Sequence, residues 1–121
     1  MPHARAQLGH QGEDLAVAFL QSRGFCILAR NWRIRLGEID IIAKRDNRIH
    51  FIEVKTRRTS TYGYPEEAVT PAKVRVIARV GEAWLLGYFQ PYSGFQIDVI
   101  SIEFRGHESP NILFIESVDM S

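Results

Sequence analysis

The chain has 121 residues, of which 45% are hydrophobic and 24% charged, so residues 1–121 are long enough for one globular domain with its own core. A single cysteine excludes an intrachain disulfide framework and a zinc cluster built on cysteines. No stretch approaches the roughly 18 apolar residues of a membrane span, and the first residues lack the apolar core of a signal peptide. We therefore expect a cytoplasmic protein that does not enter the membrane.

The charge is unevenly divided along the chain. Residues 1–79 carry 14 Lys/Arg against 8 Asp/Glu, a net charge of +6, whereas residues 80–121 carry 1 against 6, a net charge of −5. Twelve of the 15 basic residues are arginine, whose planar fork of donors suits phosphate. The first two-thirds of the chain is therefore a candidate surface for a polyanion, with a solvated basic surface as the alternative.

The first half of the chain predicts one helix and three strands. Apolar residues recur at helical spacing over residues 8–22, and Gly24 is a plausible stop. Residues 25–30 form a short β-prone run in which we expect Cys26 to be buried. Residues 38–44 and 48–56 are two further strands, and Asp46-Asn47 between them indicates a hairpin turn.

The second half predicts one more helix and two more strands. Residues 57–69 are polar and contain glycine and proline, so they read as a loop. Thr70-Pro71 supplies an N-cap and a first-turn proline for a helix that ends near Gly87. Strands follow at residues 95–104 and 112–115. The order α-β-β-β-α-β-β predicts an α/β or α+β domain with a mixed sheet.

The residues with the clearest chemistry lie in segments 37–43 and 51–57. Alternation along a strand places Glu53 and Lys55 on one face and Ile52 and Val54 on the other, toward a core. The same alternation sets Glu38 and Asp40 against Ile39 and Ile41. A hairpin closed at Asp46-Asn47 then pairs Asp40 with Glu53, and Glu38 with Lys55.

Two carboxylates that face each other across neighbouring strands repel, so this arrangement needs a counter-charge. A divalent cation provides one, and hard oxygen ligands suit Mg²⁺ or Mn²⁺. Lys55 beside such an ion is placed to orient a water, aid its deprotonation or stabilise charge on a phosphate. The alternative is a salt-bridge ladder that solvates one face of the sheet. Glu-x-Lys alone favours the ladder, and Asp40 on the adjoining strand brings the two interpretations into balance.

The order Glu13, Asp40 and Glu53-Val54-Lys55 resembles the PD-(D/E)XK nuclease superfamily, which includes restriction endonucleases and archaeal Holliday-junction resolvases. More closely, the chain is similar to the YraN family of small bacterial proteins. The matching segments span about residues 9–99 and include Gly9-His10-Gln11-Gly12-Glu13, Asn31-Trp32-Arg33, residues 37–43 and 51–57, Gly63-Tyr64-Pro65-Glu66-Glu67-Ala68, Lys73 and Asp98-Val99.

The resemblance implies an α/β, restriction-endonuclease-like three-layer fold, with a mixed sheet flanked by helices. It implies that Asp40 and Glu53 bind Mg²⁺ or Mn²⁺, that the Val54 carbonyl is a third ligand and that Lys55 is catalytic. Glu13 would approach from the first helix as a further carboxylate near the metal or as a ligand of a second ion. The chain departs from the family at Gln96-Ile97, where the pattern has Arg-Phe.

Several basic residues are candidates for contact with nucleic acid. Arg57 directly follows the Glu53–Lys55 segment, and Lys73 follows the cap of the second helix. The candidates are Arg57, Lys73, Arg58 and Arg33, and Arg75 and Arg79 extend the same surface one helical turn apart. Solvated exposure is the alternative for each. Glu13 also has a structural explanation, since a carboxylate in a first turn favours the helix dipole.

The leading functional hypothesis is a divalent-metal-dependent nuclease that hydrolyses phosphodiester bonds in DNA, branched or single-stranded DNA included. The alternative is a DNA- or RNA-binding module that keeps the fold without catalysis, and a third hypothesis is a protein-interaction domain that docks through its acidic C-terminal third. One site cuts one strand, so cleavage of both strands of a duplex calls for a homodimer or two encounters.

Overall fold

The computed structural model describes residues 2–58 and 69–118, with side chains from residue 9 onward. The elements are α1 (Pro2–Ser22), β1 (Cys26–Ile34), β2 (Gly37–Arg45), β3 (Arg48–Arg57), α2 (Pro71–Leu85), β4 (Phe95–Glu103) and β5 (Asn111–Ile115). The predicted order of elements is confirmed, although α1 begins earlier and β1 ends later than the sequence indicated. Residues 59–68 of the predicted loop lie outside the described residues.

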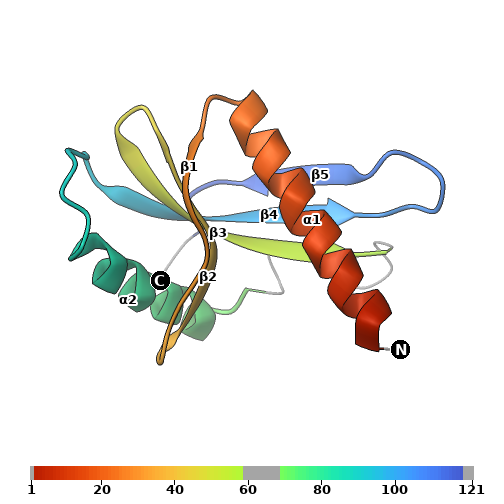
Figure 1. The fold of residues 1–121 in the computed structure, drawn as a ribbon, viewed down its shortest axis with the longest axis horizontal. Coiled ribbons are helices and arrows are strands. Elements are labelled where there is room, and N and C mark those ends of the chain that lie inside the picture. Colours follow the sequence, from red (N-terminus) through yellow and green to blue (C-terminus); the bar gives the residue numbers. More distant parts are fainter. Residues whose placement is uncertain (1, 59–68, 119–121) are drawn as a thin grey trace.

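The strands form one five-stranded mixed sheet in the order β1-β2-β3-β4-β5 (Figure 1). Strands β3 and β4 are parallel and are connected through α2, whereas the other neighbouring pairs are antiparallel. Asp46 and Asn47 have φ of 51° and 67°, the positive values that a tight two-residue hairpin turn requires at both central positions. The predicted mixed sheet and the predicted turn are both confirmed, and the chain is an α/β protein.

The two helices cover opposite faces of the sheet. Ala16 and Leu20 of α1 pack in one buried cluster with Ile52 of β3. Val74 of α2 packs in a second cluster with Phe51, the preceding residue of β3, and successive residues of a strand point to opposite faces. This arrangement is consistent with a three-layer fold. Neither helix, within the residues that the structure describes, is long and apolar enough to cross a membrane.

Two glycines let both helices approach β3 closely. A Cβ added to Gly12 of α1 would overlap the Thr56 side chain, and one added to Gly81 of α2 would overlap the ring of Phe51. Only a residue without a side chain fits where these side chains of β3 come this near to the helix. A helix therefore packs closely on each face of β3, and the residues next to Gly12 lie close to the sheet.

The alternation of β2 breaks at Asp40. Ile41 belongs to the cluster beneath α1, whereas Ile39 belongs to the cluster beneath α2. The prediction that Ile39 and Ile41 share a face is therefore wrong. Asn31, at the facing position on β1 between the pairs Arg30↔Ile41 and Trp32↔Ile39, has a positive φ of 51°. The β1–β2 pairing keeps its register across this position and shifts only between Ile27 and Ala29, and Gly37 at the start of β2 lies against Val76 of α2.

Strand β1 is an edge of the sheet, and its first residue faces outward. Cys26 is exposed, so the prediction that it is buried is wrong. The apolar character of residues 25–30 does not by itself reveal that the strand lies at the edge of the sheet, where a side chain can face solvent.

Candidate active site at the fork of two strands

The site lies where β2 and β3 separate (Figure 1). The two strands pair from Arg45↔Arg48 to Ile41↔Ile52, in the register that the Asp46-Asn47 turn predicts. The next position in that register brings Asp40 to Glu53, but the backbone pairing ends one step earlier. Asp40 Oδ2 instead accepts a hydrogen bond of 2.8 Å from the backbone N–H of Val54. The Asp40 side chain thus satisfies the N–H of Val54, which lies beyond the last backbone pair of β2 and β3.

The carboxylate of Asp40 is in an unfavourable electrostatic environment. Burial, the charge of Glu53 and smaller contributions from Glu13 and Glu38 raise its pKa to about 7, against the lowering effect of the Val54 N–H. Near neutral pH the carboxyl is therefore divided between its charged and neutral forms. A cation between these groups would favour the charged form, because it screens Asp40 from Glu53.

Glu53 lies opposite two lysines. Its Oε1 is 3.3 Å from Nζ of Lys73 and 3.8 Å from Nζ of Lys55, and its side chain is only 10% exposed. Lys55 comes from the same strand, whereas Lys73 comes from the first turn of α2, where its backbone N–H donates to the predicted cap, Thr70. The structure thus brings Lys73, expected only as a phosphate contact, into the Glu53 site.

The two amino groups have opposite pKa shifts. Burial and the neighbouring Lys73 lower the pKa of Lys55, although Glu53 opposes the shift. Burial also acts to lower the pKa of Lys73, but hydrogen bonding to Lys55 and the attraction of Glu53 outweigh it, so that pKa is raised. Lys55 is therefore the amine that loses its proton more readily, while Lys73 stays charged.

Glu13 reaches the edge of this site from α1. Its Oε1 accepts a hydrogen bond of 3.0 Å from Nδ2 of Asn31 and lies 3.6 Å from a guanidinium nitrogen of Arg30. Helix α1 begins at Pro2, so Glu13 is not in its first turn and the explanation by the helix dipole is wrong. Strand β1 holds this carboxylate, and its charge acts on Asp40.

The other predicted nucleic-acid contacts lie around the fork. Arg33 Nε donates to Glu38 Oε2 at 2.8 Å, which replaces the predicted partnership of Glu38 with Lys55, and 74% of the Arg33 side chain is exposed. Arg57 is the last residue of β3 and is partly buried, and Arg58 follows it exposed. Arg33 is thus neutralised locally, whereas Arg58 presents its charge to solvent.

The donor set at the fork fits a hard divalent cation. Asp40 and Glu53 offer carboxylate oxygens, the ligand type that Mg²⁺ and Mn²⁺ prefer, and the repulsion between them is the energy that a cation would relieve. The carboxylate oxygens of Glu13, Asp40 and Glu53 do not all lie within 4.8 Å of one another. Among the described residues, the group of three whose possible ligand atoms do so is His50, Asp98 and Glu116.

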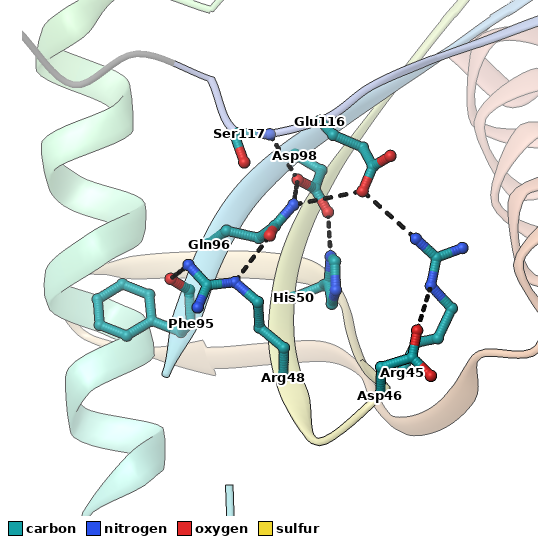
Figure 2. Close-up of polar contacts among 9 residues, drawn as sticks. All are labelled: Arg45, Asp46, Arg48, His50, Phe95, Gln96, Asp98, Glu116 and Ser117. Atoms are coloured by element: carbon teal, nitrogen blue, oxygen red, sulfur yellow. Dashed lines mark hydrogen bonds and ion pairs between the residues drawn. The ribbon is translucent and has the colours of Figure 1, made fainter. Parts of the chain in front are cut away.

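The group of His50, Asp98 and Glu116 was not predicted as a site. Hydrogen bonds within the protein account for its buried carboxylate (Figure 2). Asp98 is fully buried, and its Oδ2 lies 2.6 Å from Nδ1 of His50. Its Oδ1 accepts from Nε2 of Gln96 at 2.7 Å and from the backbone N–H of Ser117 at 2.9 Å. Glu116 is exposed at the rim. Both oxygens of Asp98 have protein partners, which is how a buried carboxylate is tolerated.

Gln96 takes up a structural role in this network. Its Oε1 accepts a 2.8 Å hydrogen bond from Nε of Arg48, and its Nε2 donates to Asp98 (Figure 2). Gln96 thus links an arginine of β3 to Asp98 of β4. A sequence signal for the network existed, because His50 interrupts the apolar run 49–52 and Asp98 interrupts the apolar run 97–100, and both residues are buried.

Comparison with known proteins identifies relatives over nearly the whole chain. The model of the family described as "Uncharacterised protein family UPF0102" matches residues 12–102. A UPF0102 protein of Mycolicibacterium vanbaalenii is 42% identical over 115 residues, which cover 95% of each chain. One of Caldicellulosiruptor saccharolyticus is 45% identical over 98 residues, 81% of this chain and 83% of the relative. The predicted resemblance to YraN-like small bacterial proteins is confirmed.

Proposed function

We propose that this chain, which belongs to the uncharacterised protein family UPF0102, is a divalent-metal-dependent endonuclease that hydrolyses phosphodiester bonds in DNA. We assign its three layers to the restriction-endonuclease-like fold and its Asp40, Glu53 and Lys55 to the PD-(D/E)XK constellation. The observation that carries the proposal is the meeting of Asp40 and Glu53 at the fork of β2 and β3, with two lysine amino groups within 3.8 Å of Glu53 Oε1.

Each residue of the site has a separate role in this proposal. Asp40, Glu53 and the Val54 carbonyl would hold Mg²⁺ or Mn²⁺, and Glu13 would add negative charge from α1. The ion supplies Lewis-acid stabilisation of the phosphate oxygens. Lys55, whose pKa is lowered by burial, accepts a proton from the attacking water. The water oxygen forms a bond to phosphorus as one phosphodiester P–O bond breaks, and the leaving oxygen takes up a proton.

Basic side chains on α2 and β3 are candidates for contact with the DNA backbone. Lys73 lies in the first turn of α2 beside Glu53, whereas the exposed Arg75 and Arg79 lie one turn apart on the side of the helix that faces solvent. Arg58 lies exposed at the end of β3, the strand that carries Glu53 and Lys55. These side chains favour phosphate contacts that are independent of sequence, which suits an enzyme that reads DNA by shape or strandedness.

The test is cleavage of labelled single-stranded, duplex and branched DNA in Mg²⁺ or Mn²⁺ by the native protein and by Glu53→Gln and Lys55→Met. The proposal expects cleavage that chelator stops and that both substitutions reduce at least a hundredfold. Arg35→Met is a matched control, since Arg35 is an exposed cation in the β1–β2 turn. Nicking of duplex without double-strand breaks at low protein concentration would indicate one site acting per encounter.

Two results separate the enzyme from a binding module of the same fold. DNA binding that survives chelator, with no cleavage of any substrate, would leave a non-catalytic nucleic-acid-binding protein. The loss of binding at higher salt would then follow from counterion release alone. Cleavage retained by Glu53→Gln would place the active site elsewhere in the molecule.

A further inference from the structure

We propose that Lys73 occupies the place of the metal on Glu53 in the metal-free protein, and that binding of the divalent ion releases its ammonium group to a phosphate of the DNA. The inference rests on the proposed function, because it concerns the same site. It adds a residue of α2 that positions the substrate only when the metal is bound.

The contact that Lys73 makes is with a metal ligand of the proposal. Its Nζ lies 3.3 Å from Oε1 of Glu53, a carboxylate that is only 10% exposed. Asp40, another acidic group at the fork, repels Glu53. A buried carboxylate with a like charge beside it needs a cation, and in the metal-free protein Lys73 supplies it together with Lys55.

The same position does not accommodate both an ion and Lys73. A Mg²⁺ ion ligated by a carboxylate lies about 2.0–2.1 Å from the oxygen, so an ammonium within 3.3 Å of that oxygen would sit a few ångströms from a doubly charged cation. Two cations at that separation repel strongly in a partly buried site. One of them has to leave Glu53, and the ion is held by further ligands.

Lys73 has the freedom to leave. Its side chain is 42% exposed, more than the 30% of Lys55, and it is attached to the first turn of α2, which stays fixed through the Thr70 cap. The amino end of a helix also favours anions. The released ammonium would therefore stay on the side of α2 that faces Glu53, at the place where phosphate meets the metal.

The exchange makes two measurable demands on the protein. Metal binding has to break the Lys73–Glu53 ion pair, so removing Lys73 should strengthen metal binding. DNA binding must gain a phosphate contact when the metal is present, so metal and DNA favour each other's binding through this residue. Coupling of this kind is reciprocal between the two ligands.

The first experiment is calorimetric titration of Mn²⁺ into the native protein, Lys73→Met, Lys73→Arg, Arg79→Met and Glu53→Gln. Lys73→Met should bind Mn²⁺ roughly tenfold more tightly, which corresponds to about 1.4 kcal/mol. Lys73→Arg keeps the ion pair and should stay close to the native protein. Arg79→Met removes an equal charge from the exposed side of the same helix and should change the affinity by less than about twofold.

The second experiment measures the salt dependence of binding to a phosphorothioate single strand, which resists cleavage. In Mn²⁺, the slope of log K against log salt should be smaller for Lys73→Met than for the native protein by about 0.7, the loss of one phosphate contact. In chelator the two slopes should agree, because Lys73 is then engaged by Glu53.

The outcomes separate this inference from the proposed function. If Glu53→Gln abolishes Mn²⁺ binding and Lys73→Met binds it no more tightly than the native protein, the metal site stands and the exchange is wrong. If neither the native protein nor Lys73→Met binds Mn²⁺, the exchange fails together with the metal site. If Lys73→Met tightens binding but no DNA is cleaved, the exchange holds in a protein that is not a nuclease.

Discussion

The Asp40 carboxylate accepts a hydrogen bond of 2.8 Å from the backbone N–H of Val54, one position beyond the last pair of the β2–β3 ladder. The bond anchors a carboxylate whose pKa burial and Glu53 raise to about 7. The side chain is therefore fixed by the backbone in a position that its charge disfavours.

The charge of Asp40 should make stability depend on pH. Its pKa is raised from 3.8 to about 7 in the folded protein, so the unfolded chain gives up this proton first as pH rises. The free energy of unfolding should fall between about pH 4 and pH 7, and Asp40→Asn should remove this fall, a difference on the order of 2–4 kcal/mol above pH 7. Denaturant unfolding in chelator at several pH values measures it. Equal pH dependence of the two proteins would contradict the assigned environment.

Lys55 should act through its neutral amine. Burial lowers its pKa, so the rate of DNA cleavage should rise with pH through that pKa and then level off. Lys55→Arg keeps the positive charge but does not lose its proton, and should reduce cleavage by about a hundredfold or more. The pH–rate profile of both proteins at saturating Mn²⁺ is the measurement. An active Lys55→Arg with an unchanged profile would show that Lys55 contributes charge alone.

Gly12→Ala should destabilise the protein through a clash with Thr56. An added Cβ overlaps this side chain, and overpacking of this kind costs about 1–3 kcal/mol. Gly9→Ala is the matched control, because nothing lies within 4 Å of its added Cβ and alanine favours a helix over glycine by up to about 1 kcal/mol. The double variant Gly12→Ala/Thr56→Ala should recover most of the loss in denaturant unfolding. A stable Gly12→Ala would show that α1 can shift on β3.

His50→Ala should weaken the fold and leave metal binding unchanged. It removes the 2.6 Å partner of the buried Asp98 carboxylate and leaves a small cavity, at a cost of about 2–4 kcal/mol. Thermal unfolding measures the loss of stability, and titration of Mn²⁺ into the folded variant measures its affinity for the metal. Should Mn²⁺ affinity disappear in His50→Ala and persist in Glu53→Gln, the ion binds at His50, Asp98 and Glu116.

Local patterns in the sequence determined the elements, the β2–β3 register and half of the site. Period-two alternation located β2 and β3, Thr70-Pro71 located the start of α2, and the Asp46-Asn47 turn fixed which residues oppose each other. The turn succeeds because a two-residue loop permits one register, and that register directs Asp40 toward Glu53. Sequence reasoning reached these residues because each signal spans only a few neighbours along the chain.

Only the tertiary structure decided which distant residues complete the site. Lys73 meets Glu53 because the parallel β3–β4 connection lays α2 across one face of the sheet. Asn31 holds Glu13 because α1 packs on the opposite face. Strand β2 leaves β3 beyond the pair Ile41↔Ile52, and its first residue, Gly37, lies against Val76 of α2. These contacts join segments far apart in sequence, and packing of the core, rather than any local pattern, sets their distances.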